Sequence, residues 1–166
     1  MMYTIISGTN RAESHSQKVA AEYHRLLREK DIDAIIFSLQ NVDVLHRNKD
    51  FQKIENEILF PADKFIFIIP EYNGTFPGVL KAMIDTSEIK KAWYGKKVLL
   101  TGVSTGRAGN LRGMDHLSAC LHYLKMHVHY NKLPISIIDK VMDKNGRLND
   151  ATLKAINEQL DEFINF

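Results

Sequence analysis

Short apolar runs alternate with longer amphipathic segments along the whole chain. The apolar runs are continuous rather than interleaved with polar residues, and they cover residues 3–7, 34–37, 65–69, 98–103 and 135–138. Continuous runs of this length are typical of strands that are buried on both faces of a parallel sheet. The pattern therefore predicts five buried strands.

The segments between these runs have helical periodicity. One set of positions recurs at intervals of three or four, the spacing of one helix face: Leu111, Met114, Leu117 or Ser118, Leu121 and Leu124. The predicted helices cover residues 16–29, 51–59, 78–86, 111–125 and 149 to the C-terminus. Strands that alternate with helices predict an α/β fold, a doubly wound parallel sheet with helices on both faces. No repeat or change of composition divides the chain, so we expect one domain over residues 1–166.

Composition narrows the classes of partner. The net charge of +2 arises from 22 basic and 20 acidic residues without a dense run of one sign, which argues against a nucleic-acid groove or an anionic membrane surface. Cys120 is the single cysteine, and the N-terminus lacks the basic region and cleavage site of a signal peptide. The apolar runs are far shorter than the roughly 20 residues that span a bilayer. We expect a cytoplasmic protein that binds a small molecule, with no membrane segment and no nucleic-acid partner.

Three loops are candidates for that binding site. In a doubly wound sheet, ligands bind beyond the carboxyl ends of the strands, near the point where strand order reverses. The loops after the first, third and fourth runs read "SGTNRAESHS" (7–16), "PEYNGTFPG" (70–78) and "STGRAGN" (104–110), and all are rich in glycine, hydroxyl or flat side chains. The stretch after the second run contains no glycine.

The first loop has the chemistry of a phosphate site. It combines several hydroxyls with Gly8, which allows close backbone approach, and with the positive charge of Arg11, immediately before a predicted helix N-terminus. An alternative with about equal weight is an ordinary polar loop in which Ser14 or Ser16 caps the helix. The chain has neither G-x-x-x-x-G-K-[ST] nor G-x-G-x-x-G, so the pattern favours a single phosphate bound without a metal.

The second and third loops suit a flat polar ring. Asn73-Gly74 readily adopts positive φ and can turn backbone N–H groups outward, beside the aromatic Tyr72. The alternative is a long turn in which Tyr72 and Phe76 pack on the sheet edge, and we expect a packing role for Phe76. The amides of the third loop can meet carbonyl oxygens of the same ring, although a glycine-rich turn before a helix is also a common structure.

Together the three loops resemble the NADPH-dependent FMN reductase family of flavodoxin-like proteins, which includes flavin, quinone, azo-dye and chromate reductases. The family pattern G-S-x-R-x-x-S-x-N corresponds to "GTNRAESHS", P-x-Y-N-x-[ST]-x-P-G-x-L-K-x-x-I-D to "PEYNGTFPGVLKAMID", and S-x-G-x-x-G to "STGRAG". The middle motif is the specific one because it fixes many positions over a short span. Three positions depart from the pattern: Thr9 replaces Ser, Ser16 replaces Asn, and Thr86 replaces an aromatic residue after Asp85.

The resemblance implies FMN as the cofactor, NADPH or NADH as the reductant and a small electron acceptor. It also implies a homodimer or dimer of dimers, with the helix after "PGVLKAMID" near the interface. It places the FMN phosphate near the first loop and the isoalloxazine ring between the other two. The implied cofactor-binding residues are Thr9, Arg11, Ser14, His15, Ser16, Pro70, Glu71, Tyr72, Asn73, Gly74, Ser104, Thr105, Gly106, Arg107, Ala108 and Gly109.

We expect no catalytic side chain and no metal site, because a flavin supplies the redox chemistry and the protein supplies orientation. His127 and His129 lie on one face of a possible strand, but two imidazoles alone make a poor metal site, and we expect a structural role.

Nicotinamide and acceptor are expected to use the same open face of the flavin in turn, which predicts ping-pong kinetics. Two other classes stay open: a flavodoxin-like electron carrier, which the net charge of +2 disfavours, and a non-enzymatic FMN-binding module.

Overall fold

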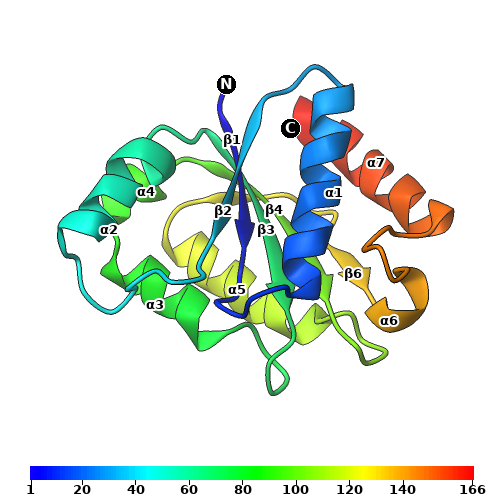
Figure 1. The fold of residues 1–166 in the computed structure, drawn as a ribbon. Coiled ribbons are helices and arrows are strands. Elements are labelled where there is room, and N and C mark those ends of the chain that lie inside the picture. The colour runs from blue at the N-terminus through cyan, green and yellow to red at the C-terminus, as the bar shows by residue number, and fades with distance from the viewer.

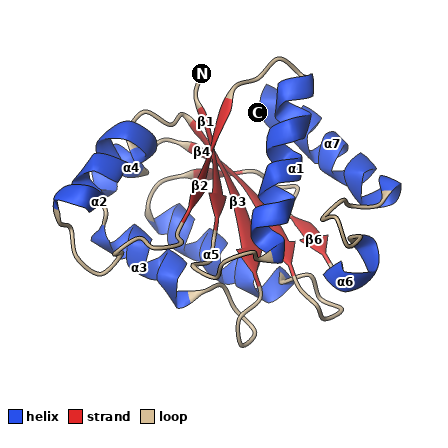
Figure 2. Ribbon diagram, viewed as in Figure 1, coloured by secondary structure: helices blue, strands red, loops and turns tan.

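The computed structural model describes residues 1–166 and places one parallel sheet between two layers of helices (Figures 1 and 2). The main strands are β1 (Tyr3–Ser7), β2 (Ala34–Ser38), β3 (Lys64–Pro70) and β4 (Lys97–Val103), which match the predicted runs within a residue. The sheet order is β2-β1-β3-β4-β5, in which β5 covers His127–Val128, and β6 (Leu133–Ile135) also pairs with β4. Strand order reverses beside β1, between β1 and β3, so the predicted α/β doubly wound fold is confirmed.

Burial along the strands follows their position in the sheet. Every residue of the central β1 is buried, as are all residues of β3 except its last. β2 is different, because it lies at the edge and leaves Ile35 and Ile36 37% and 39% exposed. The prediction that all the strands are buried on both faces is therefore wrong for β2.

The fifth strand also differs from the prediction. Instead of one strand over residues 135–138, the chain forms two short pieces, β5 (His127–Val128) and β6 (Leu133–Ile135), which pair with opposite ends of β4. Ile137 adopts φ +48°, which ends the extended run, and α6 (Ile138–Val141) begins at the next residue. The apolar run at residues 135–138 therefore belongs partly to strand β6 and partly to helix α6.

Two hydrophobic clusters hold the helices to the sheet. On one face, α1 (His15–Glu29) and α7 (Asp150–Asn165) pack with residues such as Tyr23, Leu27 and Phe163 (Figure 1). The other face carries α2 (Lys49–Ile54), the π-helix η1 (Glu55–Leu59), α3 (Gly78–Thr86), α4 (Ile89–Ala92) and α5 (Leu111–Tyr123). The predicted helix at 51–59 is thus an α-helix continued by a π turn. Phe76 packs against this second cluster, as expected. None of the helices is long and apolar enough to cross a bilayer.

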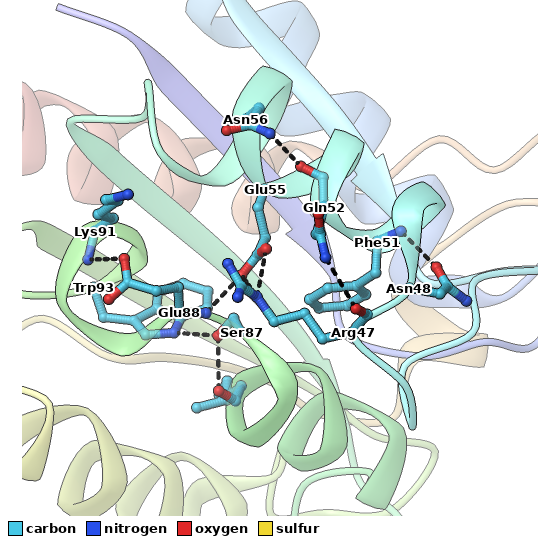
Figure 3. Close-up of polar contacts among 11 residues, drawn as sticks. Arg47, Asn48, Phe51, Gln52, Glu55, Asn56, Ser87, Glu88, Lys91 and Trp93 are labelled. Carbon is cyan, nitrogen blue, oxygen red and sulfur yellow. Dashed lines mark hydrogen bonds and ion pairs between the residues drawn. The ribbon is translucent and has the colours of Figure 1, made fainter.

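A buried carboxylate joins η1 to the segment before α4 (Figure 3). Glu55 is fully buried, and its side chain accepts hydrogen bonds from Arg47 Nε at 2.8 Å and from the backbone N–H of Glu88 at 2.6 Å. Beside it, Trp93 Nε1 donates to Ser87 Oγ at 2.7 Å. These contacts satisfy polar groups that burial would otherwise leave unpaired.

Candidate functional site

The three candidate loops meet at the carboxyl ends of β1, β3 and β4 and line one cavity of about 440 Å³. This volume lies within the range of small-molecule pockets, roughly 300 to 1,000 Å³. The cavity wall includes most of the residues that the sequence indicates: Arg11, Ser14, His15, Ser16, Pro70, Glu71, Tyr72, Asn73, Ser104 and Thr105. Segments that are distant in the chain therefore form a single site, as the topology predicts.

The first loop ends at the N-terminus of α1 and leaves donors unused there. Ser14 is the N-cap, because its side chain accepts from the N–H of Gln17 at 3.2 Å. Ser16 is 1% exposed and its hydroxyl has no hydrogen-bond partner within the protein. The buried Nδ1 of His15 also has none. A buried polar atom without a partner is costly, so these atoms indicate a polar ligand.

Arg11 and Tyr72 connect the first loop to the second. The guanidinium carbon of Arg11 lies 4.2 Å from the centre of the Tyr72 ring, and the Tyr72 hydroxyl is 2.5 Å from Thr9 Oγ1. Arg11 forms no ion pair with a carboxylate, unlike Arg25 and Arg47. Its charge is thus available to an anion in the cavity.

The second loop is a tight two-residue turn. The backbones of Tyr72 and Thr75 exchange hydrogen bonds of 2.9 and 3.1 Å, and Asn73 and Gly74 both have positive φ, at 51° and 77°. This is the conformation that Asn-Gly favours, and the expectation of positive φ is confirmed. His116 of α5 braces the loop, since its Nδ1 lies 2.9 Å from Thr75 Oγ1.

The third loop is shaped by its own polar contacts. Ser104 Oγ donates to the carbonyl of Gly106 at 2.9 Å and accepts from the N–H of Gly109 at 3.0 Å. Asn110, in a left-handed conformation, donates from Nδ2 to the carbonyls of Ile69 and Pro70, at 3.0 Å each. This residue ties the third loop to the end of β3, a positioning role that its place in the sequence did not reveal.

Some of the indicated residues lie behind or beside the cavity wall. Thr9 is buried against Tyr72, Gly74 lies at the apex of its turn, and Gly109 packs against Pro134. Gly106, Arg107 and Ala108 are exposed parts of the third loop. Ala12, Val103 and Ile138 line the cavity but were not indicated by the sequence. Ile138 was missed because residues 135–138 were read as one strand.

The donor set suits FMN. The first-loop end offers Arg11, the unpaired Ser16 hydroxyl and the N-terminus of α1, all of which favour a phosphate. Tyr72, whose ring lies against Arg11, lines the cavity together with Asn73 of the turn and with Ser104 and Thr105 of the third loop. Donors for a phosphate together with a flat aromatic side chain and a polar turn suit a flavin mononucleotide.

Comparison with known proteins identifies the family. Residues 1–137 match the sequence profile of the NADPH-dependent FMN reductases. An NAD(P)H-dependent FMN reductase from Pseudomonas aeruginosa is 35% identical over 103 residues, which cover 60% of this chain and 56% of that protein. A quinone reductase from Pseudomonas putida is 28% identical over 96% of this chain and 90% of its own length.

Solved structures show the same fold at low identity. The flavoenzyme NAD(P)H:(acceptor) oxidoreductase FerB from Paracoccus denitrificans has a TM-score of 0.79 at 21% identity, over 99% of this chain and 95% of that one. A flavodoxin from Streptococcus pneumoniae has a TM-score of 0.67 at 11% identity, over 99% of both chains. With most of its length matched by the family profile, the chain belongs to the NADPH-dependent FMN reductase family of oxidoreductases, which use FMN as cofactor and NAD(P)H as reductant.

Proposed function

We propose that this chain, as one FMN-binding domain, transfers reducing equivalents from NAD(P)H to a small acceptor such as a free flavin, a quinone or an azo compound. The observation that carries the proposal is the meeting of the three loops in one cavity, whose wall includes Arg11 and Ser16, with its unpaired hydroxyl, as well as Asn73 of the second-loop turn. FMN, when bound, supplies the chemistry: it accepts a hydride from nicotinamide and passes electrons to the acceptor.

The residues of the chain would bind the cofactor and orient its ring. Arg11, Ser14 and Ser16, with the N-terminus of α1, hold the phosphate and anchor the cofactor at one end. The segment from Pro70 to Gly74 and the third loop would flank the ring. The N–H groups of Glu71 and Tyr72 are donated within the protein, so those of Asn73, Gly74 and the exposed part of the third loop would be the ones available to stabilise negative charge. We assign no catalytic side chain, because hydride transfer to a positioned ring requires no acid–base pair.

An anaerobic titration tests the proposal. Protein loaded with FMN and desalted is expected to retain a flavin spectrum, and stepwise addition of NADPH or NADH should bleach it. Failure to retain flavin would contradict the FMN site. Retention of flavin without bleaching by either nicotinamide would instead favour an electron carrier or a non-enzymatic flavin-binding module.

We also propose a homodimer that uses α3 and α5. A mainly apolar groove of about 440 Å³ lies between these helices and is lined by Ile84, Ile89, Cys120, Tyr123 and Leu124, among others. Tyr123 is 82% exposed and Ile89 40%, so the face leaves apolar surface in water that a second copy would cover. Light scattering at micromolar concentration is expected to give twice the chain mass, and Tyr123→Glu should shift the mass toward that of one chain. A wild-type protein with the mass of one chain contradicts the dimer.

A further inference from the structure

His15 connects the cavity to α6. It is the first residue of α1 and lines the cavity, and its Nε2 lies 3.1 Å from Asp139 Oδ1 in α6. Its other ring nitrogen, Nδ1, is buried and has no partner within the protein. One ring nitrogen therefore contacts a carboxylate, whereas the other is buried at the site without a hydrogen-bond partner.

The position of Asp139 depends on an unusual backbone. Ile137 has φ +48°, which is rare for a β-branched residue. Its N–H donates to the carbonyl of Gly106 at 2.9 Å, and the N–H of Ile138 donates to the carbonyl of Ser104 at 2.9 Å. These bonds hold the start of α6 against the third loop and thereby place Asp139 beside the N-terminus of α1.

We propose that Asp139 is a positioning residue that orients the ring of His15 for contact with the phosphate of FMN. With the ring Nε2–H donating to Asp139, a neutral imidazole would present a lone pair at Nδ1, which repels a phosphate oxygen. The imidazolium, with a second proton taken from solvent, instead donates from Nδ1 to the phosphate while Asp139 compensates its charge. Arg11 and Glu71 are the other charged residues of the cavity wall. The inference rests on the proposed FMN site.

The direction in which Asp139→Asn changes FMN affinity distinguishes a role through His15 from a direct effect of the Asp139 charge on the phosphate. A carboxylate close to a phosphate repels it, so if Asp139 acted only through its charge, Asp139→Asn would tighten FMN binding. If Asp139 acts through His15, the same substitution weakens FMN binding, because the imidazolium loses its compensating partner. Riboflavin lacks the phosphate and should be insensitive to either effect.

The test compares dissociation constants of FMN and riboflavin, measured by quenching of flavin fluorescence at fixed pH and salt. The proteins are the wild type, Asp139→Asn, His15→Phe, the double variant, and the control Asp161→Asn, which removes a similarly exposed carboxylate that pairs with Lys30 at 2.7 Å. We expect about three- to fivefold weaker FMN binding in Asp139→Asn, the range for a partly exposed charge pair. The double variant should be no weaker than His15→Phe, and riboflavin binding should be unchanged in all.

Each outcome decides a separate point. Unchanged or tighter FMN binding in Asp139→Asn overturns the inference, as does an equal loss of FMN and riboflavin, which would mean that the substitution disturbs the fold of the site. The same loss in Asp161→Asn would attribute the effect to net charge and also overturn it. A wild-type protein that does not distinguish FMN from riboflavin contradicts the proposed phosphate site itself.

Discussion

At the scale of single residues, Arg11 shows how the site differs from an ordinary loop. Its guanidinium rests on the Tyr72 ring and has no carboxylate partner, so its positive charge is uncompensated within the protein. A charge-assisted contact to phosphate contributes roughly 1.5 to 3 kcal/mol, and Arg11→Ala is expected to weaken FMN binding about ten- to a hundredfold. Fluorescence titration measures the change, with Arg28→Ala as a control, because Arg28 lies on α1 and does not line the cavity. Equal affinity in the two variants would reduce Arg11 to a surface residue.

Gly74 tests the second loop. Its φ of +77° disfavours any branched side chain, and a Cβ there would lie 3.3 Å from Arg112 Nη1. Gly74→Val is expected to move the turn and slow flavin reduction by NAD(P)H about tenfold or more in stopped flow, with a smaller effect on FMN retention. Gly95→Val is a matched control, because Gly95 has φ +73° and open space but lies away from the cavity. Reduction at the wild-type rate in Gly74→Val would contradict the role of this loop.

At the scale of elements, the π-helix η1 depends on a buried charge. Glu55 has a side chain 1% exposed, whereas its partner Arg47 is 44% exposed, so water reaches one side of the pair. Arg47→Ala leaves the carboxylate buried with the Glu88 N–H and is expected to lower the free energy of unfolding by about 1 to 3 kcal/mol. Arg25→Ala, which breaks exposed pairs on α1, should cost less than about 1 kcal/mol. Urea denaturation compares the two, and equal losses would show that the burial of Glu55 is unimportant.

The half-buried side chain of Lys96, at the C-terminal end of η1, predicts that stability depends on pH. Its Nζ donates to the carbonyls of Leu59 and Phe60 at 2.7 and 2.9 Å, and burial lowers the pKa of this lysine from 10.5 to about 8. Between these two pH values the folded protein has released the proton and the unfolded chain retains it, so stability rises with pH. The stability difference between wild type and Lys96→Met is therefore expected to change in favour of the wild type from pH 8 to pH 10. A constant difference in denaturation midpoints would contradict this.

At the scale of the whole molecule, the fold was predictable because the apolar runs and the helical periodicity between them indicate the same α/β architecture. Apolar runs and helical periodicity are local, so the strands β1, β3 and β4 were located within a residue. The edge position of β2 and the division of the fifth strand depend on tertiary pairing, which periodicity does not record. The contacts of His15 with Asp139 and of Asn110 with β3 likewise join segments that are distant in the sequence.

The whole cavity also determines the expected kinetics. In the proposed site, the second and third loops would cover one side of a bound flavin ring, so we expect nicotinamide and acceptor to use the remaining side in turn. NAD(P)⁺ then leaves before the acceptor enters, and initial rates at several quinone concentrations are expected to give parallel double-reciprocal lines, the pattern of a ping-pong enzyme. Excess quinone should compete with NADPH for the same surface. Intersecting lines would require both substrates to bind together and would contradict a single shared face.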